Sequence, residues 1–180
     1  MTKFSKRNII FVLCFIVIFS LQDFILKPII KEKYLYDDLK DFKNYSWKYT
    51  VSIIVLIATI IIFRIRKSLK AYQIPVIILA FMFFGTSFYF GVHNLIDNTI
   101  LYINSITEGS RIVKTYNVIS HKENKTFWLN NKDSVHERND LENINKSRTK
   151  NGLKSIFEYQ NNDTIRVSFN KGLINVNYLE

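Results

Sequence analysis

The chain has 180 residues, 48% of them hydrophobic, with 25 Lys and Arg against 15 Asp and Glu, and one cysteine. A single cysteine excludes an internal disulfide framework. The net charge of +10 does not indicate a nucleic-acid-binding protein, because residues 105–180 carry only twelve basic against nine acidic residues, without a basic stripe of interleaved aromatic residues. Attraction to anionic lipid headgroups accounts better for the charge.

The first apolar segment, residues 8–26, has no formal charge before Asp23. At about 1.5 Å per residue it would extend roughly 28 Å, close to the thickness of a hydrocarbon core. Lys3, Lys6 and Arg7 ahead of it also suit a cleaved signal peptide, but no small-residue cleavage motif follows. We therefore favour an uncleaved signal anchor.

Residues 27–47 separate the first apolar segment from the second. Leu35, Leu39 and Phe42 fall there at helical spacing among charged residues. This pattern predicts either an amphipathic helix lying on the membrane or on the soluble domain, or a solvated helical linker.

The second and third apolar segments are residues 48–65 and 74–96. The strictly apolar part of the second segment, residues 51–63, is short. Trp47 and Tyr49 before that part, and Arg64 and Arg66 after it, extend the span to headgroup level. The third is uncharged apart from His93. We predict three transmembrane helices at 8–26, 48–65 and 74–96.

The third segment also gives the orientation. Lys67 and Lys70 precede it closely, and no basic residue follows it until Arg111. The positive-inside rule then predicts a cytoplasmic N-terminus and an extracytoplasmic C-terminal domain. A composition rich in Lys, Ile and Asn and poor in Gly and Pro favours a bacterial inner (plasma) membrane.

Residues 105–180 show strand-like alternation and turn residues, so residues 1–104 are predicted as the membrane domain and 105–180 as a soluble β-domain. The polar residues 131–151 suit a loop or a marginal helix. We predict a small all-β domain of about five antiparallel strands, arranged as a meander or a small open barrel. The five segments are 111–120, 125–130, 153–159, 164–170 and 173–179.

Three ionisable residues, Asp23, His93 and Asp97, are predicted to lie at one depth near the outer ends of spans 1 and 3. His93 and Asp97 are four residues apart and share a helix face. Ionisable groups in a membrane span are candidates for a proton or metal site. Because these three lie near the interface, where water reduces the cost of a charge, we favour a structural or capping role.

Small residues in the third span, Gly85, Ser87 and Gly91, are predicted to pack against another helix of the chain or to form a homodimer face. No nucleophile elbow, zinc-protease motif, P-loop or zinc-spaced Cys/His set is present in the sequence. We therefore expect no catalytic residue, metal or cofactor.

The segment Asp163–Ile174 resembles the closing hairpin of a group of small, largely uncharacterised bacterial multi-pass membrane proteins with a short C-terminal β-domain. Leu95-Ile96-Asp97 resembles the junction that follows their last span. The resemblance covers about twenty residues, and Asn162 and Asn175 stand where that pattern has Gly. It implies an architecture and no activity.

These features favour a non-enzymatic envelope protein whose extracytoplasmic β-domain mediates interaction or assembly. The expected partners are the lipid bilayer and either a protein partner or a second copy, bound through the third span or the β-domain. The alternative is a subunit of a membrane enzyme or transporter that uses Asp23, His93 and Asp97. An immunity or stress protein of the inner membrane fits the same features.

Overall fold

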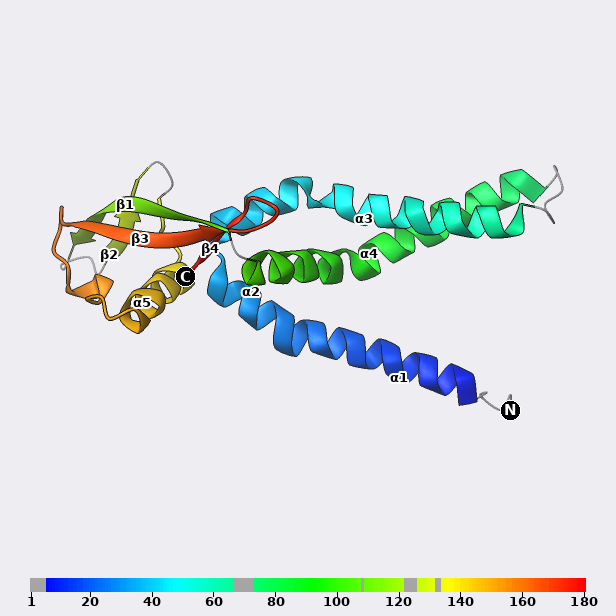
Figure 1. Cartoon of the computed structure of the whole chain (residues 1–180), viewed down its shortest axis with the longest axis horizontal. Coiled ribbons are helices and arrows are strands. Elements are labelled where there is room, and N and C mark those ends of the chain that lie inside the picture. The colour runs from blue at the N-terminus through cyan, green and yellow to red at the C-terminus, as the bar shows by residue number, and fades with distance from the viewer. Residues whose placement is uncertain (1–5, 67–72, 108, 122–125, 132–133) are drawn as a thin grey trace.

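A computed structural model describes residues 6–66, 73–107, 109–121, 126–131 and 134–180 (Figure 1). The molecule is elongated, with long helices at one end and a small sheet with one helix at the other. The start of the first long helix, the end of the second and the start of the third lie at the end far from the sheet (Figure 1).

The first helical stretch runs without a break through α1 (Lys6–Leu21), the π-helical turn η1 (Gln22–Leu26) and α2 (Lys27–Lys33). Pro28 lies in the first turn of α2. Its ring has no N–H and clashes with the carbonyl four residues earlier in a regular α-helix, so the wider turn at η1 gives it room. Gln22 is the buried residue of this turn.

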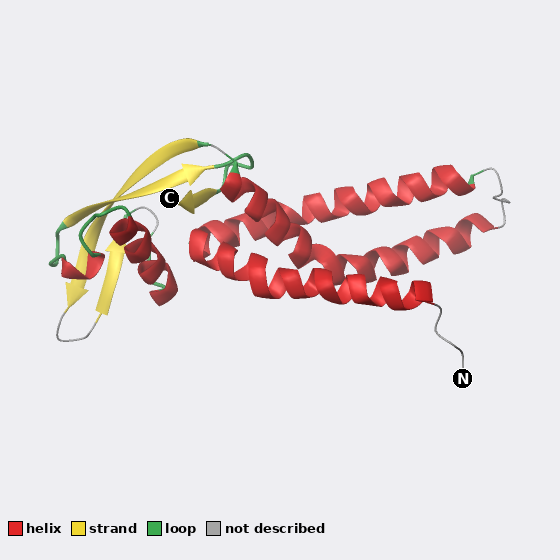
Figure 2. Ribbon diagram, turned by 60° about the horizontal axis from the view of Figure 1, so that its bottom comes forward, coloured by secondary structure: helices red, strands yellow, loops and turns green. Residues whose placement is uncertain are grey.

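Helices α3 (Tyr36–Ile65) and α4 (Ile74–Ile106) lie side by side (Figures 1 and 2). The described chain holds three helical stretches that are long and apolar enough to cross a membrane: Leu13–Lys33, α3 and α4. With 30 and 33 residues, α3 and α4 are about 45 and 50 Å long, which exceeds the roughly 30 Å of a hydrocarbon core.

Burial divides these helices into two parts. Their buried residues lie in the parts nearest the sheet, whereas most large apolar side chains farther away are exposed. The buried residues of the long helices are Phe42, Ser46 and Thr50 in α3, and Asp97, Leu101, Asn104 and Ser105 in α4. Protein atoms thus cover one end of the helices and leave an apolar surface on the rest.

The C-terminal sheet contains β1 (Ser110–His121), β2 (Thr126–Asn130), β3 (Thr164–Lys171) and β4 (Asn177–Leu179). The order is β2-β1-β3-β4 and every pair is antiparallel. Helix α5 (Arg138–Lys150) covers one face of the sheet (Figure 2). Ile165, Val167 and Phe169 of β3 point into this core, in the predicted alternation.

The prediction of five strands is wrong, because the sheet has four, and the domain is not built from strands alone. Residues 153–159 form a loop with a short 3-10 helix, η3 (Ile156–Glu158). Ile156 is fully buried there while Phe157 is 50% exposed, so the segment inserts one side chain rather than a strand face. The meander is also wrong, since β1 lies between β2 and β3.

Two asparagines take backbone conformations that usually require glycine. Asn162 has φ of 70° and Asn175 has φ of 61°. Asn tolerates this left-handed region better than other residues with a side chain. Both turns around β3 and β4 therefore form with Asn at the positions where the resembling pattern has Gly.

Candidate functional site

The ends of the helices and the C-terminal domain share two hydrophobic clusters. Leu35, between α2 and α3, belongs to the core of the sheet and α5. A second cluster joins Tyr34 just after α2, Phe42 of α3 and Leu101 of α4 to Val176 near β4. The domain is thus packed directly on the helices rather than tethered to them.

Asn104 is the polar centre of this junction and is fully buried. Its Nδ2 donates to the Tyr34 hydroxyl and to the Val176 carbonyl, both at 2.9 Å, and its Oδ1 accepts from the Ile174 amide at 2.9 Å. The Tyr34 hydroxyl donates in turn to the Leu101 carbonyl at 2.7 Å. Burial raises the pKa of Tyr34 above its ordinary value, so it stays a neutral donor.

Two glycines allow the close approach of β3 to the end of α4. A Cβ at Gly172 would lie 2.1 Å from the Asn104 carbonyl oxygen, and one at Gly109 would lie 1.7 Å from the Lys171 carbonyl oxygen. Both contacts are with backbone atoms, so any larger residue would force the strands and the helix apart.

Helix α5 caps the break between α2 and α3. The Asp140 carboxylate accepts a hydrogen bond from the Tyr36 amide at the start of α3 at 2.8 Å, and Asn143 Nδ2 donates to the Lys31 carbonyl in the last turn of α2 at 2.7 Å. Both backbone groups belong to helix ends, which lack partners within their own helix. Lys146 also pairs with Glu32.

Burial raises the pKa of Asp140, and the hydrogen bond from the Tyr36 amide opposes that effect. The side chain is only 8% exposed. Burial therefore removes water from the carboxylate, and the carboxylate gives the Tyr36 amide, in the first turn of α3, its hydrogen-bond partner.

The structure brings together two of the three ionisable residues singled out in the sequence. His93 Nε2 lies 3.4 Å from Asp97 Oδ2, as their four-residue spacing predicts. Ser46 of α3 donates to the same Asp97 oxygen at 3.0 Å, and the Thr50 hydroxyl lies 2.8 Å from His93 Nδ1. This polar network, Ser46–Asp97–His93–Thr50, links α3 to α4.

Asp23 does not join the polar network. It lies 3.8 Å from Lys27, and both side chains are more than half exposed. Within the part of the chain that the structure describes, Asp97 Oδ1 is buried without a hydrogen-bond partner. No group of three His, Cys, Asp or Glu side chains suited to a metal ion occurs among these described residues.

The small residues of α4 face different surroundings. A Cβ at Gly85 would lie 3.6 Å from Ile54 of α3, so this glycine faces the neighbouring helix. A Cβ at Gly91 would meet nothing within 4 Å, and Ser87, one turn earlier, is exposed. Ser87 and Gly91 thus lie on a part of α4 that no described residue covers.

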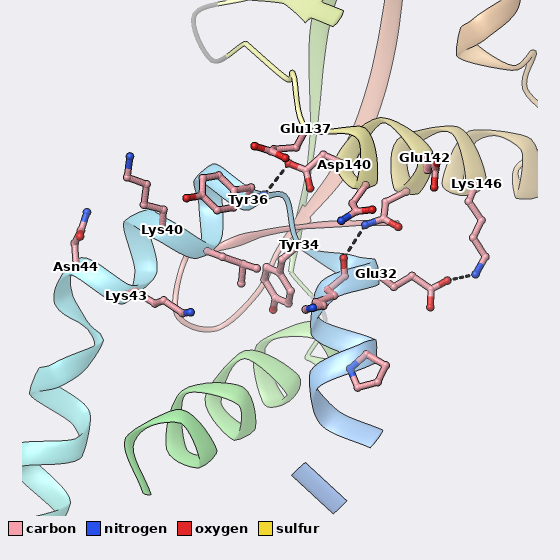
Figure 3. A pocket seen from close by; sticks show the side chains of 15 residues that line it. Glu32, Tyr34, Tyr36, Lys40, Lys43, Asn44, Glu137, Asp140, Glu142 and Lys146 are labelled. Carbon is pink, nitrogen blue, oxygen red and sulfur yellow. Dashed lines mark hydrogen bonds and ion pairs between the residues drawn. The ribbon is translucent and has the colours of Figure 1, made fainter. Parts of the chain in front are cut away.

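A groove of about 760 Å³ lies at the corner formed by α2, α3 and α5 (Figure 3). Its lining is mostly charged or polar, with Tyr36 and Leu39 among it. The lining residues are Pro28, Lys31, Glu32, Tyr34, Tyr36, Leu39, Lys40, Lys43, Asn44, Glu137, Asn139, Asp140, Glu142, Asn143 and Lys146. No sequence pattern predicts this groove, because residues 28–44 and 137–146 are brought together only by the fold.

No protein-family model, curated protein or solved structure matches this chain.

Proposed function

We propose that the chain is a multi-pass integral protein of a cell's inner (plasma) membrane, with its N-terminus in the cytoplasm and its C-terminal domain outside, and that this domain binds a partner protein without catalysing a reaction. The exposed apolar surface of the three long helices supports membrane insertion. Arg64 and Arg66 lie where α3 ends, on the side of the N-terminus, and they support the orientation.

The observation that carries the binding role is the face of the sheet that no described element covers. Helix α5 lies on one face, where Tyr116 and Val118 of β1 are buried. Residues 111, 113, 115 and 117 of β1 point the other way and are exposed. Among these, Val113 is 51% exposed. The face mixes apolar and hydrogen-bonding groups, as protein-binding surfaces do.

The junction at Asn104 supports the same role. A domain that shares clusters and buried hydrogen bonds with the helices is held at a fixed height and angle, which suits a binding surface that must meet its partner beside the membrane. The open part of α4 at Ser87 and Gly91 is a second surface that a copy of the chain could cover.

The binding role is tested by placing a photo-crosslinking amino acid at Val113 in the full chain within cells. We expect one adduct of defined mass. The matched control is Leu153, which follows α5 and is 50% exposed, and we expect no adduct there. Equal adducts at both positions, or none at Val113, would count against this surface as the binding site.

A second function, as a subunit of a membrane enzyme or transporter, is favoured by one observation, the unpartnered Asp97 Oδ1 in a polar network between two helices of the described chain. A buried carboxylate oxygen without a hydrogen-bond partner can take up a proton. Full complementation of a deletion phenotype by Asp97→Asn and His93→Ala, together with Asp23→Asn as the control, would rule this function out.

A further inference from the structure

The groove between α2, α3 and α5 has an ordered distribution of charge. Lys31, Lys40 and Lys43 line it from α2 and α3, and in the described part of the chain none of these lysines forms an ion pair. Figure 3 shows Lys43 pointing across the groove toward α2. Glu137 lies at the opposite rim with α5, and it too has no ion pair among the described residues.

The other acidic residues of the groove are already engaged. Asp140 accepts from the Tyr36 amide, Glu142 pairs with Arg138 and Glu32 pairs with Lys146. The charges without an ion pair among the described groove residues are therefore three ammonium groups on one side and the Glu137 carboxylate on the other. Lys43 also attracts the buried Asp97 carboxylate of α4. Tyr36, whose side chain is 54% exposed, lines the groove beside Glu137 (Figure 3).

The two kinds of charge lie at different heights above the proposed membrane. With spans ending at residue 26 and starting at residue 48, Lys31 and Lys43 stand about 7 Å along their helices from the hydrocarbon boundary. The headgroup layer is about 5–8 Å thick on each side. Lys31 and Lys43 therefore fall at the depth of lipid phosphates. Lys40 is about 12 Å from the boundary, and Glu137 and Tyr36 lie farther out still, beyond the helix break.

We propose that this groove binds the headgroup of a phosphatidylethanolamine molecule from the adjacent leaflet, with its phosphate between Lys31 and Lys43 and its ammonium between Glu137 and the Tyr36 ring. The proposal rests on the membrane insertion argued above. The lipid presents its charges in the same order as the groove, phosphate next to the acyl chains and ammonium outside.

Three chemical details favour this lipid over others. A primary ammonium donates hydrogen bonds to a carboxylate, which the trimethylammonium of phosphatidylcholine cannot do. Phosphatidylglycerol has no cation for Glu137. An aromatic ring face adds attraction for a cation. The groove volume of about 760 Å³ lies within the range of small-molecule sites.

The test is native mass spectrometry of the full chain purified in detergent and offered equal amounts of phosphatidylethanolamine, phosphatidylglycerol and phosphatidylcholine with identical acyl chains. We expect phosphatidylethanolamine to be retained about tenfold over each of the others, the effect of one charge-assisted hydrogen bond. Equal retention of the three lipids would overturn the proposal.

Two variants assign the charges. Glu137→Gln should abolish the preference for phosphatidylethanolamine over phosphatidylglycerol, and Lys43→Gln should weaken retention of both about tenfold. The matched control is Lys48→Gln, an exposed lysine of α3 that does not line the groove. Unchanged retention in both groove variants, or the same loss in Lys48→Gln, would overturn the assignment.

Two further measurements distinguish a lipid site from a site for a soluble ligand, and test membrane insertion separately. Water-soluble phosphoethanolamine should not displace the lipid at equal concentration, and displacement would make the groove a site for a soluble ligand instead. Resistance of the chain to extraction from membranes at alkaline pH tests insertion independently. Extraction would refute the proposed membrane protein, whereas a retained chain without lipid preference would refute only the groove.

Discussion

Replacement of Asp140 by Ala tests whether α5 stabilises the start of α3. Asp140 Oδ2 accepts from the Tyr36 amide at 2.8 Å, in the way that an N-cap side chain does from within a helix. Loss of such a cap costs about 0.5–2 kcal/mol, and burial of the partner places this site in the upper half of that range. We expect the Tyr36 amide to lose about 1–2 kcal/mol of protection, which is a factor of about 5–30 in its exchange rate.

Replacement by Asn separates the hydrogen bond from the charge. Asn keeps a side-chain oxygen for the Tyr36 amide and removes the desolvated carboxylate whose pKa is raised by burial. Asp140→Asn should therefore stay within about 0.5 kcal/mol of the original chain at pH 7. Glu142→Ala, on the same helix but exposed and paired only with Arg138, should also change little.

Hydrogen exchange of the Tyr36 amide, followed by mass spectrometry on the full chain in detergent, measures this protection directly. The reasoning is refuted if Asp140→Ala leaves the exchange rate unchanged, or if Asp140→Asn is as damaging as Asp140→Ala. The second result would mean that the carboxylate charge, and not the cap, holds α3.

Three further predictions concern the junction and its pH dependence. Asn104→Leu leaves the Ile174 amide and the Val176 carbonyl without their buried partner, and should lower the free energy of unfolding by about 3 kcal/mol in denaturant titration. Gly172→Ala places a methyl group against the Asn104 carbonyl and should also cost about 3 kcal/mol, whereas Gly152→Ala, with φ of 72° but open space, should cost only about 1 kcal/mol. Folding raises the pKa of Asp140 from its usual 3.8, so its contribution to stability is greatest below about pH 4 and is lost as pH rises through the raised pKa. The free energy of unfolding of the original chain, relative to that of Asp140→Asn, should therefore fall as pH rises from about 4 through the raised pKa. A difference between the two chains that stays constant with pH would contradict this prediction.

The long helices were predictable because hydrophobic length is a property of local composition. Residues 74–96 carry no Asp, Glu, Lys or Arg, and α4 covers all of them. The alternation in β3 was also predictable, since each inward residue is apolar. Elements of this kind need no knowledge of what packs against them.

Helix α5 was harder to predict because its inward face is partly polar. Leu141, Ile144 and Arg148 lie on one face and are buried, and the Arg148 side chain donates to the Arg166 carbonyl and, at 3.1 Å, to the Tyr159 hydroxyl. An arginine at a core position removes the apolar period that marks an amphipathic helix. Residues 153–159 were wrongly predicted for the opposite reason. Their apolar and aromatic residues are typical of a strand, but the segment contributes only Ile156 to the core.

The polar network was only half predictable. The four-residue spacing of His93 and Asp97 is visible in the sequence, but their partners Ser46 and Thr50 come from another helix and carry no charge to mark them. The Asp140 cap joins residues 104 positions apart. Contacts of this kind follow from packing, which local sequence does not specify.

The most direct test of the proposed architecture is to find on which side of the membrane the C-terminal domain and the far end of α3 lie. In a Cys14→Ser background, which removes the only native cysteine, single cysteines are introduced as Leu153→Cys in the C-terminal domain and as Arg64→Cys at the end of α3. A membrane-impermeant maleimide is then applied to intact spheroplasts and to lysed ones. We expect Leu153→Cys to be labelled in intact spheroplasts and Arg64→Cys only after lysis. Labelling of Arg64→Cys in intact spheroplasts, with Leu153→Cys protected, would contradict the orientation.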